Sequence, residues 1–89
     1  MTNSLTTIKP LVISVNTPDR PGVIQAISQT VRKYGGNWTE SNFAALEGVF
    51  VGIVKIEISE DKSQQLQNAL EALSAQQIEI RYHQSVAGD

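Results

Sequence analysis

The order of its hydrophobic periodicities constrains the fold of this chain more than any other feature. Apolar residues alternate or run together in four segments, and they recur at three- and four-residue spacing in two others. Short β-branched runs and alternation indicate strands, whereas the three-and-four spacing indicates an amphipathic helix. From the N-terminus, the segments follow the order strand, helix, strand, strand, helix, strand.

The boundaries of these segments are marked by turn and capping residues. A strand is predicted over 11–15 (LVISV) and a helix over roughly 21–34, where Gly35-Gly36 provides a left-handed end. The strand-like segments NWTESNFAAL and VFVGIVKIEI are joined by Glu47-Gly48, which predicts a hairpin. Ser59 and the acids after it predict the start of a second helix. The apolar residues of that helix and of the last strand are Leu66, Ala69, Leu70 and Leu73, then Ile78, Ile80 and Tyr82.

This order predicts an α+β fold, the ferredoxin-like βαββαβ sandwich. Two crossovers place both helices on one face of a four-stranded antiparallel sheet. The 89 residues are expected to form one domain over 9–84, with a flexible N-terminal segment over 1–8 and a flexible tail over 85–89.

Composition excludes several classes of function. A formal net charge of -2 gives no basic footprint, so direct nucleic-acid binding is not expected. No apolar run is long enough to cross a bilayer, so no membrane association is expected either. The absence of cysteine fits a cytoplasmic location and excludes a disulfide. His83 is the only histidine and is expected to be a solvated strand residue, so neither a metal site nor a cofactor is predicted.

The segment 49–58 is apolar on both faces in its first half. Phe50, Val54, Ile56 and Ile58 point one way, while Val49, Val51 and Ile53 point the other way. One set is expected to face the helices. The other set, Val49, Val51 and Ile53, predicts an interface with a second copy or a second domain, and scattered surface valines are the alternative.

The stretch NTPDRPG connects the first strand to the first helix. The first N–H groups of a helix and the positive end of its dipole face such a loop, and this arrangement attracts a carboxylate. Pro21 is expected at the first helical position, Gly22 leaves the backbone open, and Asp19 is placed to accept a bond from an ammonium group. A bound amino acid would satisfy these features, and ordinary helix capping is the alternative.

The stretch DRPGVIQAISQTVRKYGGNWTESNFAAL resembles the characteristic half of an ACT domain, and the resemblance extends over about 11–82. Within that family it is similar to the ACT modules of glycine cleavage system transcriptional repressors. The resemblance implies that an amino acid binds between two modules. The implied ligand-binding residues are Thr17, Asp19, Arg20, Pro21, Gly22, Val23 and, from the neighbouring subunit, Asn37. Trp38 departs from the usual Ile, and it either narrows the site or covers the edge of the core.

The function expected from these features is that of a small-molecule-sensing regulatory domain, not an enzyme. It is expected to form a homo-oligomer or pair with a second ACT module, and to control amino-acid metabolism or its transcription through a regulatory protein partner. An acylphosphatase-type enzyme is disfavoured because the loop lacks a glycine-rich phosphate cradle. An RNA-recognition module is disfavoured because the chain lacks stacking aromatics on a basic sheet. A ligand-free interaction and dimerisation module of the same fold is the stronger alternative.

Overall fold

Strands and helices follow one another in the predicted order in a computed structural model that describes residues 7–83. The flexible ends predicted over 1–8 and 85–89 lie outside the described residues, except that residues 7 and 8 are described and Ile8 opens the first strand. The elements are β1 (Ile8–Pro18), α1 (Val23–Lys33), β2 (Asn37–Leu46), β3 (Val49–Ser59), α2 (Glu60–Glu71), the 3-10 helix η2 (Ala72–Gln76) and β4 (Glu79–His83).

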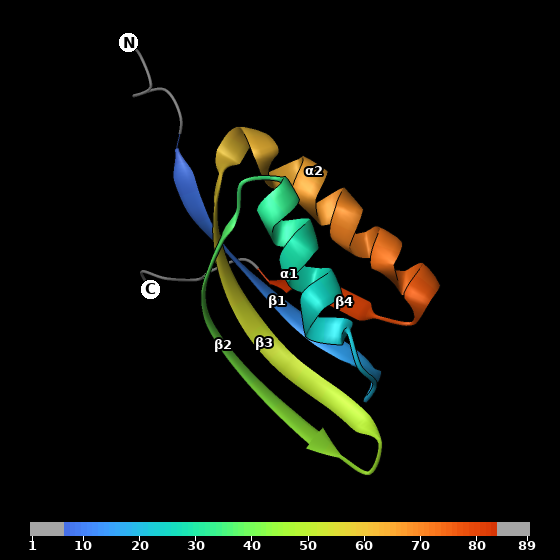
Figure 1. Ribbon diagram of the computed structural model, residues 1–89. Coiled ribbons are helices and arrows are strands. Elements are labelled where there is room, and N and C mark those ends of the chain that lie inside the picture. The colour runs from blue at the N-terminus through green and yellow to red at the C-terminus, as the bar shows by residue number, and fades with distance from the viewer. Residues whose placement is uncertain (1–6, 84–89) are drawn as a thin grey trace.

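The four strands form one antiparallel sheet in the order β2-β3-β1-β4. Both α-helices cover the same face of this sheet (Figure 1). The predicted ferredoxin-like sandwich is therefore confirmed. β2 and β4 are the outer strands of the sheet. The outer edge of β2 lies on the side of the molecule where α1 lies.

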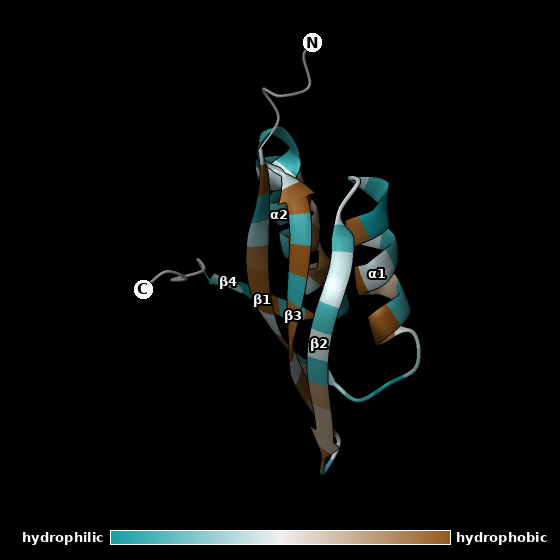
Figure 2. Cartoon of the chain, turned by 90° about the vertical axis from the view of Figure 1, so that its left-hand side faces the viewer, coloured by the Kyte–Doolittle hydropathy of each residue, from teal (hydrophilic) through white to brown (hydrophobic). Residues whose placement is uncertain are grey.

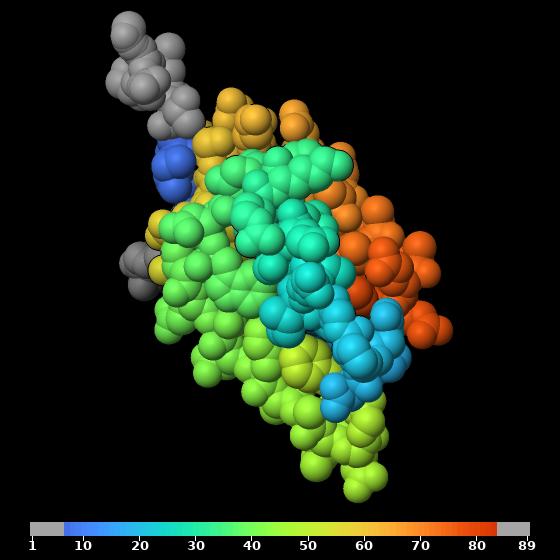
Figure 3. Space-filling view, in the orientation of Figure 1, coloured from blue at the N-terminus to red at the C-terminus, as the bar shows by residue number. Residues whose placement is uncertain are grey.

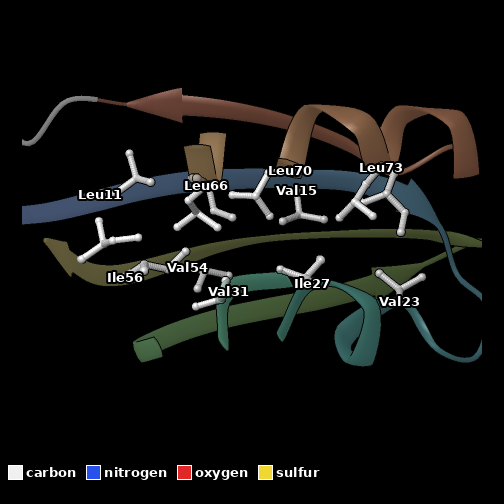
Figure 4. Close-up of a cluster of buried hydrophobic side chains, with 13 residues drawn as sticks. Leu11, Val15, Val23, Ile27, Val31, Val54, Ile56, Leu66, Leu70 and Leu73 are labelled. Carbon is white, nitrogen blue, oxygen red and sulfur yellow. The ribbon is translucent and has the colours of Figure 1, made fainter. Parts of the chain in front are cut away.

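The core fills the space between the sheet and the two helices. The helices contribute side chains at three- and four-residue spacing, and Figure 4 shows those of Val23, Ile27, Val31, Leu66 and Leu70 between helix and sheet. β1 and β3 contribute every second residue, as their alternation requires. The buried apolar residues are Leu11, Ile13, Val15, Val23, Ile27, Val31, Val54, Ile56, Ile58, Leu66, Leu70, Leu73 and Ile78.

Three local predictions about the chain near the helix starts need correction. β1 continues past Val15 to Pro18, because β3 is long enough to pair with every residue up to Pro18 opposite Val49. Pro21 is not the first helical residue, since α1 begins at Val23 after a turn. Ser59 occupies the N-cap position of α2, but its hydroxyl makes no capping hydrogen bond.

The two-sided character of β3 is confirmed. Val54, Ile56 and Ile58 are buried beneath the helices, and Phe50 packs against the same core. Val49, Val51 and Ile53 lie on the opposite face and are 41% to 51% exposed. We call this face, which carries no helix, the open face. The hairpin end of β2 and β3 is coloured as apolar in Figure 2.

Candidate functional site

The loop between β1 and α1 is held in place from two sides. The backbone N–H of Asp19 donates to the carbonyl of Gly48 in the β2–β3 turn, at 2.9 Å. The guanidinium of Arg20 donates to the carbonyl of Gln76 near the end of η2. These bonds hold the loop between the β2–β3 hairpin and the end of η2. Figure 3 shows the blue loop beside the green hairpin at the lower end of the helical face.

The N-terminus of α1 opens into this loop without a side-chain cap. Gly22 is the N-cap residue and adopts a left-handed conformation with a φ of 89°, which favours glycine. Its carbonyl accepts the N–H of Ala26 at 2.9 Å, and no side chain bonds to the first turn. The N–H groups of Val23, Ile24 and Gln25 precede the helical ladder, so they are available to an external acceptor. The capping alternative therefore finds no support in the described residues.

A hollow of about 550 Å³ lies against this helix end. Its apolar side is formed by Phe50 and Ile24, and the polar groups of Asp19, Arg20 and Ser28 surround the rest. An anion at the helix end, a cation at Asp19 and an apolar group against Phe50 would each find a suitable partner. The lining residues are Asp19, Arg20, Gly22, Val23, Ile24, Gln25, Ser28 and Phe50.

Four of the seven predicted site residues line this hollow, namely Asp19, Arg20, Gly22 and Val23. Thr17 does not, because it is the last inward-facing residue of β1 and only 3% exposed. Its hydroxyl donates to the carbonyl of Pro18 at 3.3 Å. Pro21 lies in the turn before Gly22 and is exposed, but it is not among the residues that line the hollow.

Asn37 lies at the opposite end of the sheet from the loop. It pairs with Glu57, whereas Pro18 beside the loop pairs with Val49. These partners are eight residues apart on β3, which corresponds to roughly 27 Å along a strand. Asn37 lines a separate hollow of about 360 Å³ with Tyr34 and Lys62. One chain therefore cannot bring Asn37 to its own loop.

Sequence reasoning missed Phe50, Ile24, Gln25 and Ser28 as lining residues. Ile24 and Ser28 are four residues apart on α1, so they share one helical face beside the loop. Phe50 was expected to be a core residue only, yet it pairs with Thr17 directly beneath the loop. Phe50 is brought there by the pairing of β1 with β3, and no local signal in the sequence gives that register.

Trp38 covers the edge of the core and lies far from the loop. It pairs with Ile56, packs against the buried cluster and donates its indole N–H to the Ser41 hydroxyl at 3.0 Å. Its ring is 6.2 Å from that of Phe43, which stacks on Phe50 at 5.0 Å. Within one chain, Trp38 therefore covers the edge of the core and does not narrow the site.

Residues 7–83 contain no group of three or more His, Cys, Asp or Glu side chains that could hold a metal ion. His83 lies on the open face, where its Nε2 is 3.1 Å from the Ser14 hydroxyl. No helix in this part of the chain is long and apolar enough to cross a membrane.

Comparison with known families and structures agrees with this fold. A family model described as the ACT domain matches residues 9–83. No curated protein sequence matches the chain. The match covers all elements of the sheet and both helices, so it confirms the resemblance found in the sequence.

Several solved structures share the fold at low sequence identity. A protein assigned as a glycine cleavage system transcriptional repressor is 23% identical with a TM-score of 0.82, over 92% of this chain and 48% of that one. An ACT domain protein from Streptococcus pneumoniae is 21% identical with a TM-score of 0.68, over 83% and 86% of the two chains. A formyltetrahydrofolate deformylase from Burkholderia mallei is 12% identical with a TM-score of 0.73, over 84% and 28%. This chain thus spans about half the length of the repressor chain.

Proposed function

This chain belongs to the ACT domain family, and on that premise we propose that it is a regulatory module that binds a free amino acid or a close analogue at a contact between two subunits. ACT domains are regulatory modules that commonly bind small ligands and oligomerise. The observation that carries the proposal is the uncapped N-terminus of α1, which opens into a hollow beside Asp19.

The two ends of the hollow suit the two charges of an amino acid. The ligand carboxylate accepts from the free N–H groups of the first turn of α1, where the helix dipole also favours negative charge. The ammonium group donates to the Asp19 carboxylate. The ligand side chain then lies against Phe50 and Ile24, so an apolar side chain of moderate size is favoured.

A second copy would complete the site with Asn37. β2 is an edge strand, and two such edges paired antiparallel about a two-fold axis bring the Asn37 end of one copy toward the loop end of the other. The side-chain amide of Asn37 can both donate and accept hydrogen bonds, so it suits either charged group of the ligand.

Binding is proposed to regulate a partner protein in amino-acid metabolism or its transcription in the cytoplasm, without catalysis by this domain. The solved repressor chain is about twice as long as this chain, so a second module is a suitable partner. The exposed apolar residues of the open face favour one other candidate function, a ligand-free interaction module of the same fold.

Gln25→Asp tests the site with opposite effects on stability and binding. Gln25 is the third residue of α1, so an aspartate there supplies the missing negative charge to the first turn. We expect thermal stability to be unchanged or slightly increased, whereas calorimetric binding of amino acids is lost because the new carboxylate occupies the place of the ligand carboxylate.

The matched control is Gln29→Asp, one turn further along the exposed side of α1 and outside the hollow. It adds the same charge to the same helix and is expected to retain binding. If none of the twenty amino acids gives heat with the unmodified protein, the ligand-sensing proposal is wrong and the interaction module replaces it.

A further inference from the structure

Three aromatic side chains form a row on the face of β2 and β3 that is turned toward the helices. Trp38 and Phe43 belong to β2, and Phe50 belongs to β3. The ring centroids of Trp38 and Phe43 are 6.2 Å apart. Those of Phe43 and Phe50 are 5.0 Å apart, with 9° between the ring planes. Both distances are typical of aromatic pairs in contact. The row therefore connects the edge of the core with Phe50, which lines the hollow beside the loop.

The register of β2 on β3 provides the room for this stacking. Phe43 lies opposite Gly52, and Phe50 lies opposite Ala45, so each ring faces a partner with a small side chain or none. The two phenylalanines are diagonal neighbours on one face of the sheet, a position from which aromatic rings reach each other. A Cβ built on Gly52 would overlap the Phe43 ring. The ring thus occupies the place that a side chain of residue 52 would take.

The row is anchored at the end that lies far from the hollow. Trp38 donates its indole N–H to the Ser41 hydroxyl at 3.0 Å and packs against the buried cluster. Phe43 packs against the same cluster, so it is held between Trp38, the backbone of Gly52 and Phe50. In a close-packed interior a side chain moves only where space is free. Phe50 is therefore prevented from leaning over Gly52, because the Phe43 ring fills that space.

We propose that Phe43 is a positioning residue that limits the size of the ligand side chain, although it is not among the residues that line the hollow. This inference rests on the proposed function, in which the ligand side chain lies against Phe50 and Ile24. Phe43 holds the Phe50 ring in one position, so the apolar wall of the hollow is rigid before the ligand binds. The class of ligand that this wall selects is an amino acid with a compact aliphatic side chain, such as L-valine or L-leucine.

The lining of the hollow supports this choice of ligand class. Phe50, Ile24 and Val23 are its large apolar residues, and most of the remaining lining is polar. A branched aliphatic side chain is covered by the apolar wall. A larger aromatic side chain would extend past the wall against Gln25 and Ser28, whose polar groups would lose hydrogen bonds to water.

Phe43→Ala tests the role of the support. Removal of the ring leaves space over Gly52 into which Phe50 leans, so the wall is no longer fixed and the hollow deepens toward β2. We expect the ratio of the L-leucine affinity to the L-phenylalanine affinity to fall at least tenfold, the scale on which a pocket discriminates by size. Calorimetric titrations with these two amino acids measure the ratio. Reduced stability alone lowers both affinities by the same factor, because it only reduces the folded fraction.

The matched control is Ile80→Ala. Ile80 of β4 packs against the same core, and it is not among the residues that line the hollow. Ile80→Ala is expected to reduce stability and to leave the ratio of the two affinities unchanged. Phe43→Leu is a milder variant that keeps most of the buried apolar volume but lacks the flat ring. It is expected to change the ratio in the same direction as Phe43→Ala, and it replaces that variant if circular dichroism shows Phe43→Ala to be unfolded.

The outcomes separate this inference from the proposed function. If L-leucine binds but the Phe43 variants alter both affinities by one common factor, Phe43 only supports the fold and the inference is wrong, while the proposed function stands. If the unmodified protein binds L-phenylalanine or a polar amino acid more tightly than L-leucine and L-valine, the ligand class is wrong. If none of the twenty amino acids gives heat, the proposed function is wrong and this inference is overturned with it.

Discussion

Gly22 is the residue on which the geometry of the binding loop depends. Its left-handed backbone lets the chain turn from Asp19 into α1 and leaves the N-cap without a side chain. No atom lies within 4 Å of a Cβ built at this position, so space is not the constraint. Any other residue here is strained by its φ alone. Gly22→Asp therefore cannot separate lost binding from lost stability, and Gln25 is the better position for the test.

Tyr82 gives a pH-dependent prediction at the same scale. Its hydroxyl donates to the Gln67 carbonyl at the edge of the core. Burial, together with the nearby Glu71 carboxylate, raises the pKa of Tyr82 from 10.0 to about 12. The folded protein thus holds this proton more tightly than the unfolded chain. The resulting stability is present below about pH 10 and is lost as the pH rises toward 12.

The Tyr34→Phe variant checks this prediction, because the chain has only two tyrosines and Tyr82 is then the only one left. We expect its tyrosinate absorbance to appear around pH 12 in the folded protein and around pH 10 in urea. Identical titrations in the two conditions would contradict the assignment of burial as the cause.

The hairpin of β2 and β3 depends on a close approach at Gly52. A Cβ at this position would lie 2.1 Å from the Phe43 ring and 2.6 Å from the Asn42 carbonyl oxygen. Gly52→Ala is therefore expected to destabilise the fold by about 1–3 kcal/mol, measured by urea unfolding. Adding Phe43→Ala would relieve only part of the clash, because the Asn42 carbonyl remains. An unchanged unfolding midpoint for Gly52→Ala would show that the hairpin adjusts without cost.

The elements themselves were predictable from local pattern. The stripe of α1 at Val23, Ile27 and Val31 is buried in the structure, and the alternating Ile80 and Tyr82 of β4 are partly buried against the core. What could not be predicted is where pairing overrides local sequence. Thr17 and Pro18 resemble loop residues, yet β3 extends the sheet to them. Asp19 resembles an N-cap residue, yet only its backbone is held in place. Its N–H donates to the carbonyl of Gly48 in the β2–β3 turn.

The candidate site was predictable only as a segment. The loop residues were found because Pro21 and Gly22 interrupt two regular elements. Phe50 was missed, because it lines the hollow only through the pairing of β3 with β1. Likewise, the sequence placed Val49, Val51 and Ile53 on one face, but the position of Ser14 beside Arg81 and of Asn16 beside Glu79 needed the pairing of β1 with β4.

At the scale of the whole molecule, each proposed ligand site is shared by two chains. A ligand that bridges them stabilises the pair, so ligand affinity and subunit association must rise by the same factor. Adding a ligand is therefore expected to tighten the contact along β2. Asn37→Ala is expected to weaken binding by about 1–3 kcal/mol, because it leaves a polar partner unpaired.

Mixing the Gln25→Asp and Asn37→Ala variants tests whether the site is shared. The Gln25→Asp subunit has an altered loop and an intact Asn37, whereas the Asn37→Ala subunit has an intact loop. A mixed pair therefore has one site with both parts intact and one site with both parts altered. Random mixing in equal amounts is expected to restore about a quarter of the full-affinity sites of the unmodified protein, since an isologous pair exchanges the same two surfaces. Calorimetry counts these sites. If the mixture contains no sites of full affinity, the loop and Asn37 do not meet across two chains. A stoichiometry near one quarter would instead require that each site draws its loop from one subunit and its asparagine from the other.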